Sequence, residues 1–182
     1  TGLRTVESLA IGDRILSASG EVLVVTKLER RSYGELDLDQ RPALRPIRLR
    51  AGSLGANLPP QDLVVAPDVA IHFSGQVCAN LFGAEAVAVP AKALLNDHSV
   101  TLEGSEAGVA YVEFWCDRSG VIEANGTSLV VGGVPQDSIP TETGGTDVAA
   151  SARPGHRRLR MAEAAKFMRA LCQERRKTCA QS

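Results

Sequence analysis

Short apolar or alternating runs recur along the first 133 residues, each rich in Val, Ile or Leu and bounded by Gly, Pro, Asn or Asp. Runs bounded by such turn residues are typical of β-strands, and their close spacing favours an all-β body over alternating strands and helices. The ten runs expected to form strands are residues 14–18, 21–29, 45–51, 62–66, 69–73, 85–91, 99–104, 109–116, 120–124 and 127–133.

Two segments between these runs have patterns of their own. Residues 51–61 contain two Gly and two Pro, which predicts a loop or a turn-rich crossing. Residues 90–97, "PAKALLND", are compatible with one helical turn that ends at Asn96 and Asp97.

The composition changes after residue 131. Residues 132–156 are rich in Gly, Ser, Thr and Pro, which indicates a linker. Residues 157–178 carry the only strong helical pattern, with basic residues crowded toward the end, where they suit the helix dipole. The apolar stripe of this amphipathic basic helix consists of Met161, Ala164, Ala165, Met168, Leu171 and Cys172.

The net charge of −1 hides a division between body and tail. Residues 1–152 hold 11 Lys/Arg against 19 Asp/Glu, whereas residues 153–182 hold 9 against 2. A basic helix can bind nucleic acid, an anionic membrane or a partner groove. We favour packing of its apolar stripe on the acidic body or on a second copy, and the lack of interleaved aromatics speaks against nucleic acid.

Membrane and metal signals are weak. No run approaches the ~18 apolar residues of a membrane helix, and no basic-then-apolar secretory signal opens the chain. The four cysteines form no Cys-x-x-Cys pair and the three histidines are scattered, so we expect neither a zinc site nor another cofactor. Cys78 and Cys116 lie in apolar contexts typical of buried, inert thiols, and a disulfide stays allowed.

Four segments resemble, in order and spacing, the bacterial branch of the Hedgehog/intein (Hint) domain family. The first contains the family's Val-Glu-x-Leu-x-x-Gly-Asp pattern, and the second its Ala-Gly-x-Leu-Gly and Pro-Asp elements. The third resembles Val-Pro-Ala-x-x-Leu-x-Asn-Gly, and the fourth a closing Ala-(Asn/Glu)-Gly after two β-branched residues. These segments are "GLRTVESLAIGDRIL" (2–16), "RPIRLRAGSLGANLPPQDLVVAPDVAI" (45–71), "VPAKALLND" (89–97) and "YVEFWCDRSGVIEANGTSL" (111–129).

The resemblance implies an all-β fold, a pseudo-twofold horseshoe of short strands over residues 1–131, with the family's first strand expected upstream of Thr1. It also implies self-processing. In the family a Cys or Ser at the first position attacks the preceding carbonyl, and a second nucleophile cleaves the resulting ester or thioester. This chemistry needs a deprotonated nucleophile, a protonated leaving amine and a stabilised oxyanion. A His in the middle block meets much of that need.

The positions that match the family's histidines hold other residues here. Val69 stands at the middle-block His, after Ala66 at the usual Thr or Ser position. Glu113 and Ser119 stand where closing-segment histidines are frequent. Valine cannot transfer a proton, so the pattern indicates a degenerate site on a retained scaffold.

Weaker candidates for altered acid–base or nucleophilic chemistry remain in the same blocks. His72 would reach the position of Val69 only if its strand bulges, because an offset of three places it on the opposite face. Asn125-Gly126 is a preferred tight-turn pair, and we favour a turn over Asn cyclisation. The catalytic candidates are His72, Asp68, Asp117 and Cys116.

Three functional hypotheses follow. The leading one is a catalytically degenerate Hint-type domain that serves as a structural or binding module of a larger bacterial protein, with flanking segments of its own polypeptide as partners. The second is an autoprocessing domain whose nucleophilic Cys lies upstream of Thr1. The third is an interaction protein that associates through the basic C-terminal helix. Occurrence of the family in exported or surface-associated bacterial proteins hints at such a location, but no residue here identifies one.

Overall fold

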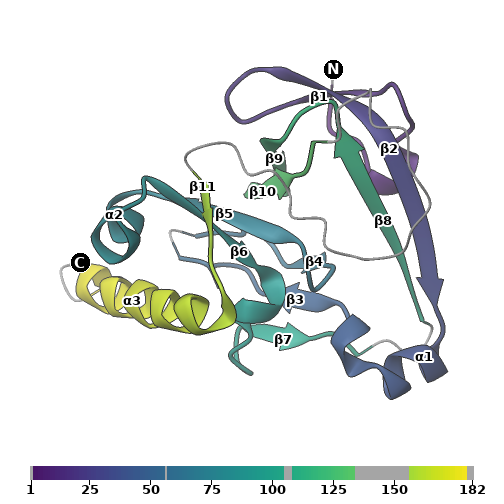
Figure 1. Ribbon diagram of the computed structural model, residues 1–182. Coiled ribbons are helices and arrows are strands. Elements are labelled where there is room, and N and C mark those ends of the chain that lie inside the picture. Colours follow the sequence, from purple (N-terminus) through teal and green to yellow (C-terminus); the bar gives the residue numbers. More distant parts are fainter. Residues whose placement is uncertain (1, 56, 105–107, 134–155, 180–182) are drawn as a thin grey trace.

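The computed structural model describes residues 2–55, 57–104, 108–133 and 156–179, and most of its regular structure is β-strand (Figure 1). Each of the ten runs expected to form strands overlaps one of β1 to β10, so the β-rich body is confirmed, although β2 extends four residues and β5 one residue beyond the expected run. The strands are β1 (Arg14–Leu16), β2 (Val22–Tyr33), β3 (Ile47–Leu49), β4 (Leu63–Val65), β5 (Ala70–Ser74), β6 (Ala86–Pro90), β7 (Val100–Leu102), β8 (Val109–Cys116), β9 (Gly120–Ala124), β10 (Thr127–Val131) and β11 (His156–Arg158).

The strands form three sheets. A five-stranded sheet has the order β11-β6-β5-β10-β9, and two three-stranded sheets have the orders β1-β2-β8 and β4-β3-β7. Figure 1 shows β2 and β8 extending together as a long ribbon away from the five-stranded sheet. The pseudo-twofold horseshoe implied by the resemblance stays a prediction.

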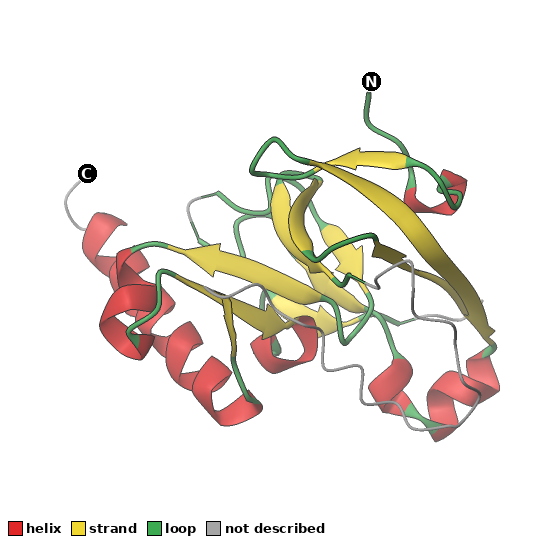
Figure 2. Cartoon of the chain, turned by 45° about the horizontal axis from the view of Figure 1, so that its top comes forward, coloured by secondary structure: helices red, strands yellow, loops and turns green. Residues whose placement is uncertain are grey.

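Helices frame the strands at opposite ends of the molecule (Figures 1 and 2). The sequence pattern did not predict the first two, because six or seven residues are too few to display a helical period. Glycine marks both ends of the second, with φ of +113° at Gly75 and +63° at Gly83. The helices are α1 (Glu35–Gln40), α2 (Gln76–Phe82) and α3 (Met161–Cys179), and the 3₁₀ turns are η1 (Val6–Ser8), η2 (Pro42–Leu44) and η3 (Ala91–Leu94).

The C-terminal segment differs in detail from the expected linker and helix. Most of the expected linker, residues 134–155, lies outside the described residues. Strand β11 begins at His156 and pairs in parallel with β6, and α3 begins four residues later than the pattern predicts. Ala164 of the expected stripe is fully buried, and so is Phe167, which the stripe left out.

Two clusters of buried side chains form the core. The larger lies between the five-stranded sheet, the sheet around β3, α2, η3 and α3. The smaller joins β2, the end of β8, β9 and β10. Leu129 packs against both clusters, so β10 connects them. The smaller cluster consists of Leu23, Val25, Cys116, Ile122 and Val131.

The segment after β6 fixes a turn between β4 and β5. The amide of Ala91 donates to the carbonyl oxygen of Val69, and the amide of Lys92 donates to that of Pro67, both at 2.9 Å. The expected helical turn is present as the 3₁₀ turn η3, which spans Ala91–Leu94 and so ends before the expected Asn96, and its first amides hold the middle block of the resemblance in place. Asn96 follows this turn and acts as an acceptor: its Oδ1 lies 2.9 to 3.1 Å from three successive backbone amides, those of residues 98 to 100.

We expect Asn96→Ala to lower the free energy of unfolding by about 2 kcal/mol, because three amides lose their acceptor. The matched control is Asp97→Gly. Asp97 has a φ of +59°, which glycine adopts freely, so this variant should stay within about 0.5 kcal/mol of the parent. Denaturant unfolding of the three proteins gives the comparison, and equal effects of the two substitutions would contradict the role assigned to Asn96.

Candidate functional site

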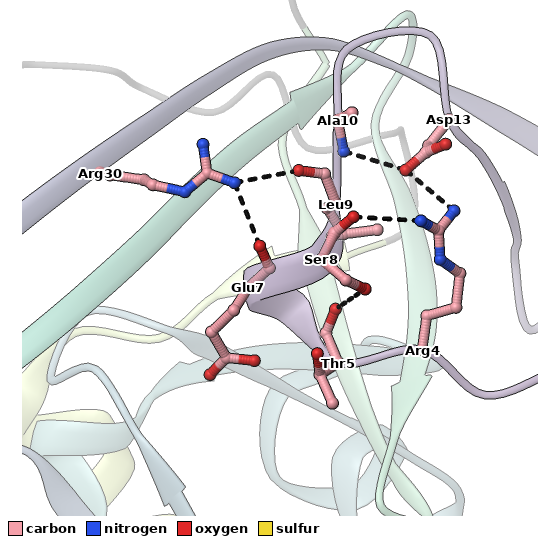
Figure 3. A network of polar contacts seen from close by, with 8 residues as sticks. All are labelled: Arg4, Thr5, Glu7, Ser8, Leu9, Ala10, Asp13 and Arg30. Atoms are coloured by element: carbon pink, nitrogen blue, oxygen red, sulfur yellow. Dashed lines mark hydrogen bonds and ion pairs between the residues drawn. The ribbon is translucent and has the colours of Figure 1, made fainter.

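The opening motif folds as a polar turn that rests on β2 (Figure 3). One carboxylate oxygen of Asp13 accepts the amide of Ala10 at 2.9 Å and an Nη of Arg4 at 3.1 Å. The amide hydrogen bond, followed by the charge of Arg4, holds the pKa of Asp13 below its usual range despite some desolvation. From β2, Arg30 donates to the carbonyl oxygens of Glu7 and Leu9, each at 3.1 Å. Both contacts of Asp13, with the Ala10 amide and with Arg4, hold this turn together, so its carboxylate has a structural role.

The middle block places Val69 at a tight turn just before β5. The amide of Val69 donates to the carbonyl oxygen of Ala66 at 3.1 Å, and its side chain packs against the larger core. Asp68 points outward instead, with its side chain 75% exposed and 2.6 Å from Nζ of Lys92. The position expected for an imidazole thus holds a partly buried isopropyl group.

His72 lies on a strand without a bulge. The register of β5 against β6 runs unbroken from Ala70 opposite Pro90 to Ser74 opposite Ala86. Ile71 and Phe73 belong to the larger core, so the alternation of the strand directs His72 to the other face. The bulge that would bring His72 to the position of Val69 is absent from this strand.

Cys116 ends β8 inside the smaller core. Its exposed fraction is 0%, and burial, followed by the nearby Asp117 carboxylate, raises the pKa of the thiol to about 11. A cysteine nucleophile acts as the thiolate, so a raised pKa opposes that role at neutral pH. The sequence-based interpretation of Cys116 as a core thiol agrees with this geometry.

Asp117 and Arg118 tie the end of β8 to β2. Val24 and Asp117 exchange two hydrogen bonds: the Val24 amide donates to Oδ1 of Asp117 at 2.9 Å, and the Asp117 amide donates to the Val24 carbonyl at 2.8 Å. Arg118 donates to the carbonyl oxygen of Val22 at 2.7 Å. A carboxylate that accepts a backbone amide serves as an anchor for the strand.

Gly132 and Gly133 lie across this closing segment. The Cys116 amide donates to the Gly132 carbonyl, and the Gly133 amide donates to Oγ of Ser119, both at 3.0 Å. A Cβ at position 133 would lie 2.4 Å from the Ser119 amide nitrogen, which is a steric clash, so only glycine fits here. Sequence reasoning placed these glycines both at the end of the last strand run and at the start of the linker, and did not assign them a contact, although a Gly-Gly pair directly after a strand is a signal for such a close approach.

Strand pairing brings the middle and closing blocks into one region. Ala70, the residue after Val69, lies opposite Val130 of β10. The chain continues from Val130 to Gly133, which bridges to Cys116. The backbone of residues 131–133 therefore runs between the two blocks whose side chains the family uses for catalysis.

The remaining candidates lie elsewhere in the fold. Glu113 faces Glu29 across the β2–β8 ribbon and is exposed. Asn125 and Gly126 form the tight turn between β9 and β10, with φ of +46° and +69°, which confirms the turn over the cyclising asparagine.

No feature of the described residues points to a bound metal or a membrane span. Among the described ranges no three His, Cys, Asp or Glu side chains come close enough together to hold a metal ion. None of the helices in the described part of the chain is both long and apolar enough to cross a bilayer. A shallow hollow beside the opening motif is lined by Leu9, Ala10, Ile11, Leu28 and Arg30, and none of the catalytic candidates contributes to it.

We expect Cys116 to resist iodoacetamide in the native protein at pH 8 and to react once guanidinium unfolds the chain. Its folded pKa near 11 lies above the ordinary value of 9.0, so the stability it contributes is present below pH 9 and is lost as the pH rises toward 11. Peptide mapping by mass spectrometry measures the modification of this cysteine alone. Cys116→Ala should flatten the alkaline loss of stability, and native labelling as fast as that of an unstructured cysteine would contradict its burial.

Comparison with known proteins places the chain in a family. A family model described as the Hint domain matches residues 1–129, about seven tenths of the sequence. No curated protein and no solved structure matches the chain. The matched range covers all four segments on which the resemblance was based and ends within β10. The chain belongs to the Hint domain family.

Proposed function

We propose that this Hint domain has lost the self-processing chemistry of its family and serves as a structural or binding module within a larger bacterial protein. The observation that carries the proposal is Val69 at the middle-block position, packed against the core and fixed through its carbonyl oxygen by the Ala91 amide. A hydrocarbon side chain neither accepts nor donates the proton that an amide-to-ester shift requires.

The other candidate groups of the middle and closing blocks support the same conclusion because the fold already uses them. Asp117 accepts a backbone amide of β2, and Ser119 accepts the amide of Gly133. Cys116 is buried with a raised pKa, and Asp68 points to solvent beside Lys92. Replacing these contacts by contacts to a scissile peptide would break the anchors of β2 and of residues 132–133.

The fold holds together sequence blocks that are distant along the chain. The polar turn of the opening motif rests on β2, the β2–β8 ribbon ends in the smaller core, and β10 connects that core to the larger one. Such a scaffold holds the segments that enter and leave it at fixed positions. Flanking segments of the same polypeptide are therefore the partners we assign to the module.

The test is incubation of the natural full-length protein with dithiothreitol or hydroxylamine between pH 7 and 8.5, followed by intact-mass measurement. We expect an unchanged mass, because Val69 stands at the position of the family's acid–base histidine and cannot protonate the leaving amine. A Hint domain that cleaves under the same conditions is the positive control. A new amino terminus at a Cys or Ser upstream of the Gly2 turn would identify an autoprocessing enzyme and refute the proposal.

Two variants separate the routes by which cleavage could arise. Loss of cleavage in His72→Ala would assign the acid–base role to that histidine, and loss in Cys116→Ala would assign a nucleophile to the closing segment. Glu123→Gln, an exposed substitution on β9, is the matched control and should leave any cleavage unchanged.

A further inference from the structure

We propose that the edge of β6, together with α2 and η3, is a peptide-binding site for a strand–helix segment, and that residues 156–171 are its resident and separable ligand. The family match ends at residue 129, so the binding surface belongs to the Hint body and the ligand belongs to an extension outside the matched range. The inference is independent of the chemistry proposed above.

The first half of the site binds a strand. Every residue of β6 is buried, and β11 extends the five-stranded sheet along its free side with Arg157 opposite Val87. After the strand ends, the amide of Leu159 donates to the carbonyl oxygen of Ala88 at 2.9 Å. Addition of a short strand to an open sheet edge is an established mode of peptide recognition, in which backbone hydrogen bonds provide affinity.

The second half binds the apolar face of a helix. Phe167 of α3 is 1% exposed, and its ring lies 4.9 Å from that of Phe73 and 6.0 Å from that of Phe82, measured between centroids. Leu159 and Ala164 are buried in the same cluster. Leu159, Ala164 and Phe167 therefore form a spaced set of anchors, Leu-x4-Ala-x2-Phe, which gives the site its side-chain specificity.

Arg157 and Glu163 organise the turn between strand and helix. The guanidinium of Arg157 lies 5.6 Å from the centre of the Phe82 ring, forms an ion pair with Glu163 and reaches the Phe82 carbonyl oxygen at 3.5 Å. Glu163 also accepts the amide of Arg160 at 3.0 Å. Contacts within residues 156–171 themselves therefore fix the angle between β11 and α3.

The surfaces that the ligand leaves outside are basic. Arg158, Arg160, Lys166 and Arg169 are exposed, whereas the apolar side of α3 faces the body. Binding of the tail in the groove therefore depends on the apolar anchors. Substitution of a basic residue next to an anchor is a matched control, because it removes a side chain of similar size that does not enter the groove. Lys166 beside Phe167 meets this requirement.

The covalent connection explains how a modest affinity keeps the site filled. Gly133, where the body ends, is fixed by its hydrogen bond to Ser119, and 22 residues of sequence separate it from His156. The Gly-, Ser-, Thr- and Pro-rich composition of this stretch predicts a linker. A linker of this length gives an effective concentration of about a millimolar, so a ligand with a Kd of about a micromolar is almost always bound. The same segment of a second copy, or another chain with the same anchors, fits the site once the resident ligand leaves.

The experiment uses the full chain with residues 141–147 replaced by the recognition sequence of a specific protease. After cleavage under reducing, non-denaturing conditions, we expect the C-terminal fragment to elute with the body in size-exclusion chromatography. A labelled peptide of residues 156–179 should then exchange into the site with a measurable Kd. Phe167→Ala in that peptide should weaken binding about a hundredfold, whereas Lys166→Ala should change it less than about threefold.

Three outcomes would overturn the proposal. Separation of the fragments at every accessible concentration would show that only the tether holds the tail in place. Loss of the β-sheet circular dichroism signal of the body when the peptide leaves would show that the tail is an inseparable part of the core. Equal weakening by Lys166→Ala and Phe167→Ala would show that charge, and not the groove, determines binding.

Discussion

Strand β6 is the element on which the arrangement of this molecule depends. It is buried along its whole length and pairs with β5 on one side and β11 on the other. It then continues into η3, whose first amides hold the turn at Pro67 and Val69. A single buried strand thus positions both the middle block of the family motif and the C-terminal extension. Because its backbone groups are removed from water, they must all find partners, and this requirement couples the two regions.

The chemistry that the family performs is limited here by what its positions contain. An N–S or N–O acyl shift needs proton transfer and charge stabilisation in one place. Strand pairing joins the end of the middle block to β10, which follows the closing motif. The side chain of Val69 packs against the larger cluster, the Cys116 thiol is buried in the smaller one, and Asp117 and Ser119 bond to backbone. Under the function proposed above, the β-rich scaffold of the Hint family is retained and the groups that would carry the reaction are lost.

Local pattern predicted the strands because alternation and turn residues act over a few positions. It also predicted the turn at Asn125-Gly126, where the positive φ values suit that pair. It missed α2, which is too short to show a period, and Phe167, whose burial depends on Phe73 and Phe82 far away in the sequence. Val69 was identified from the family pattern, whereas the crossing of Gly132–Gly133 over Ser119 was not, because no local rule reveals which backbone a glycine approaches.

The packing of the basic tail against the acidic body changes how the division of charge along the sequence is interpreted. A basic amphipathic helix with a free apolar face would suit a membrane surface or a partner groove. In this chain Ala164 and Phe167 bury that face against the body, so the apolar part of the helix is already used. In the described part of the tail the exposed face is dominated by Arg158, Arg160, Lys166 and Arg169, and charges with little accompanying apolar surface affect association rate more than affinity. If the peptide site proposed above exists, stable assembly through the apolar face of the tail requires its release from β6 and α2, because Ala164 and Phe167 are buried there.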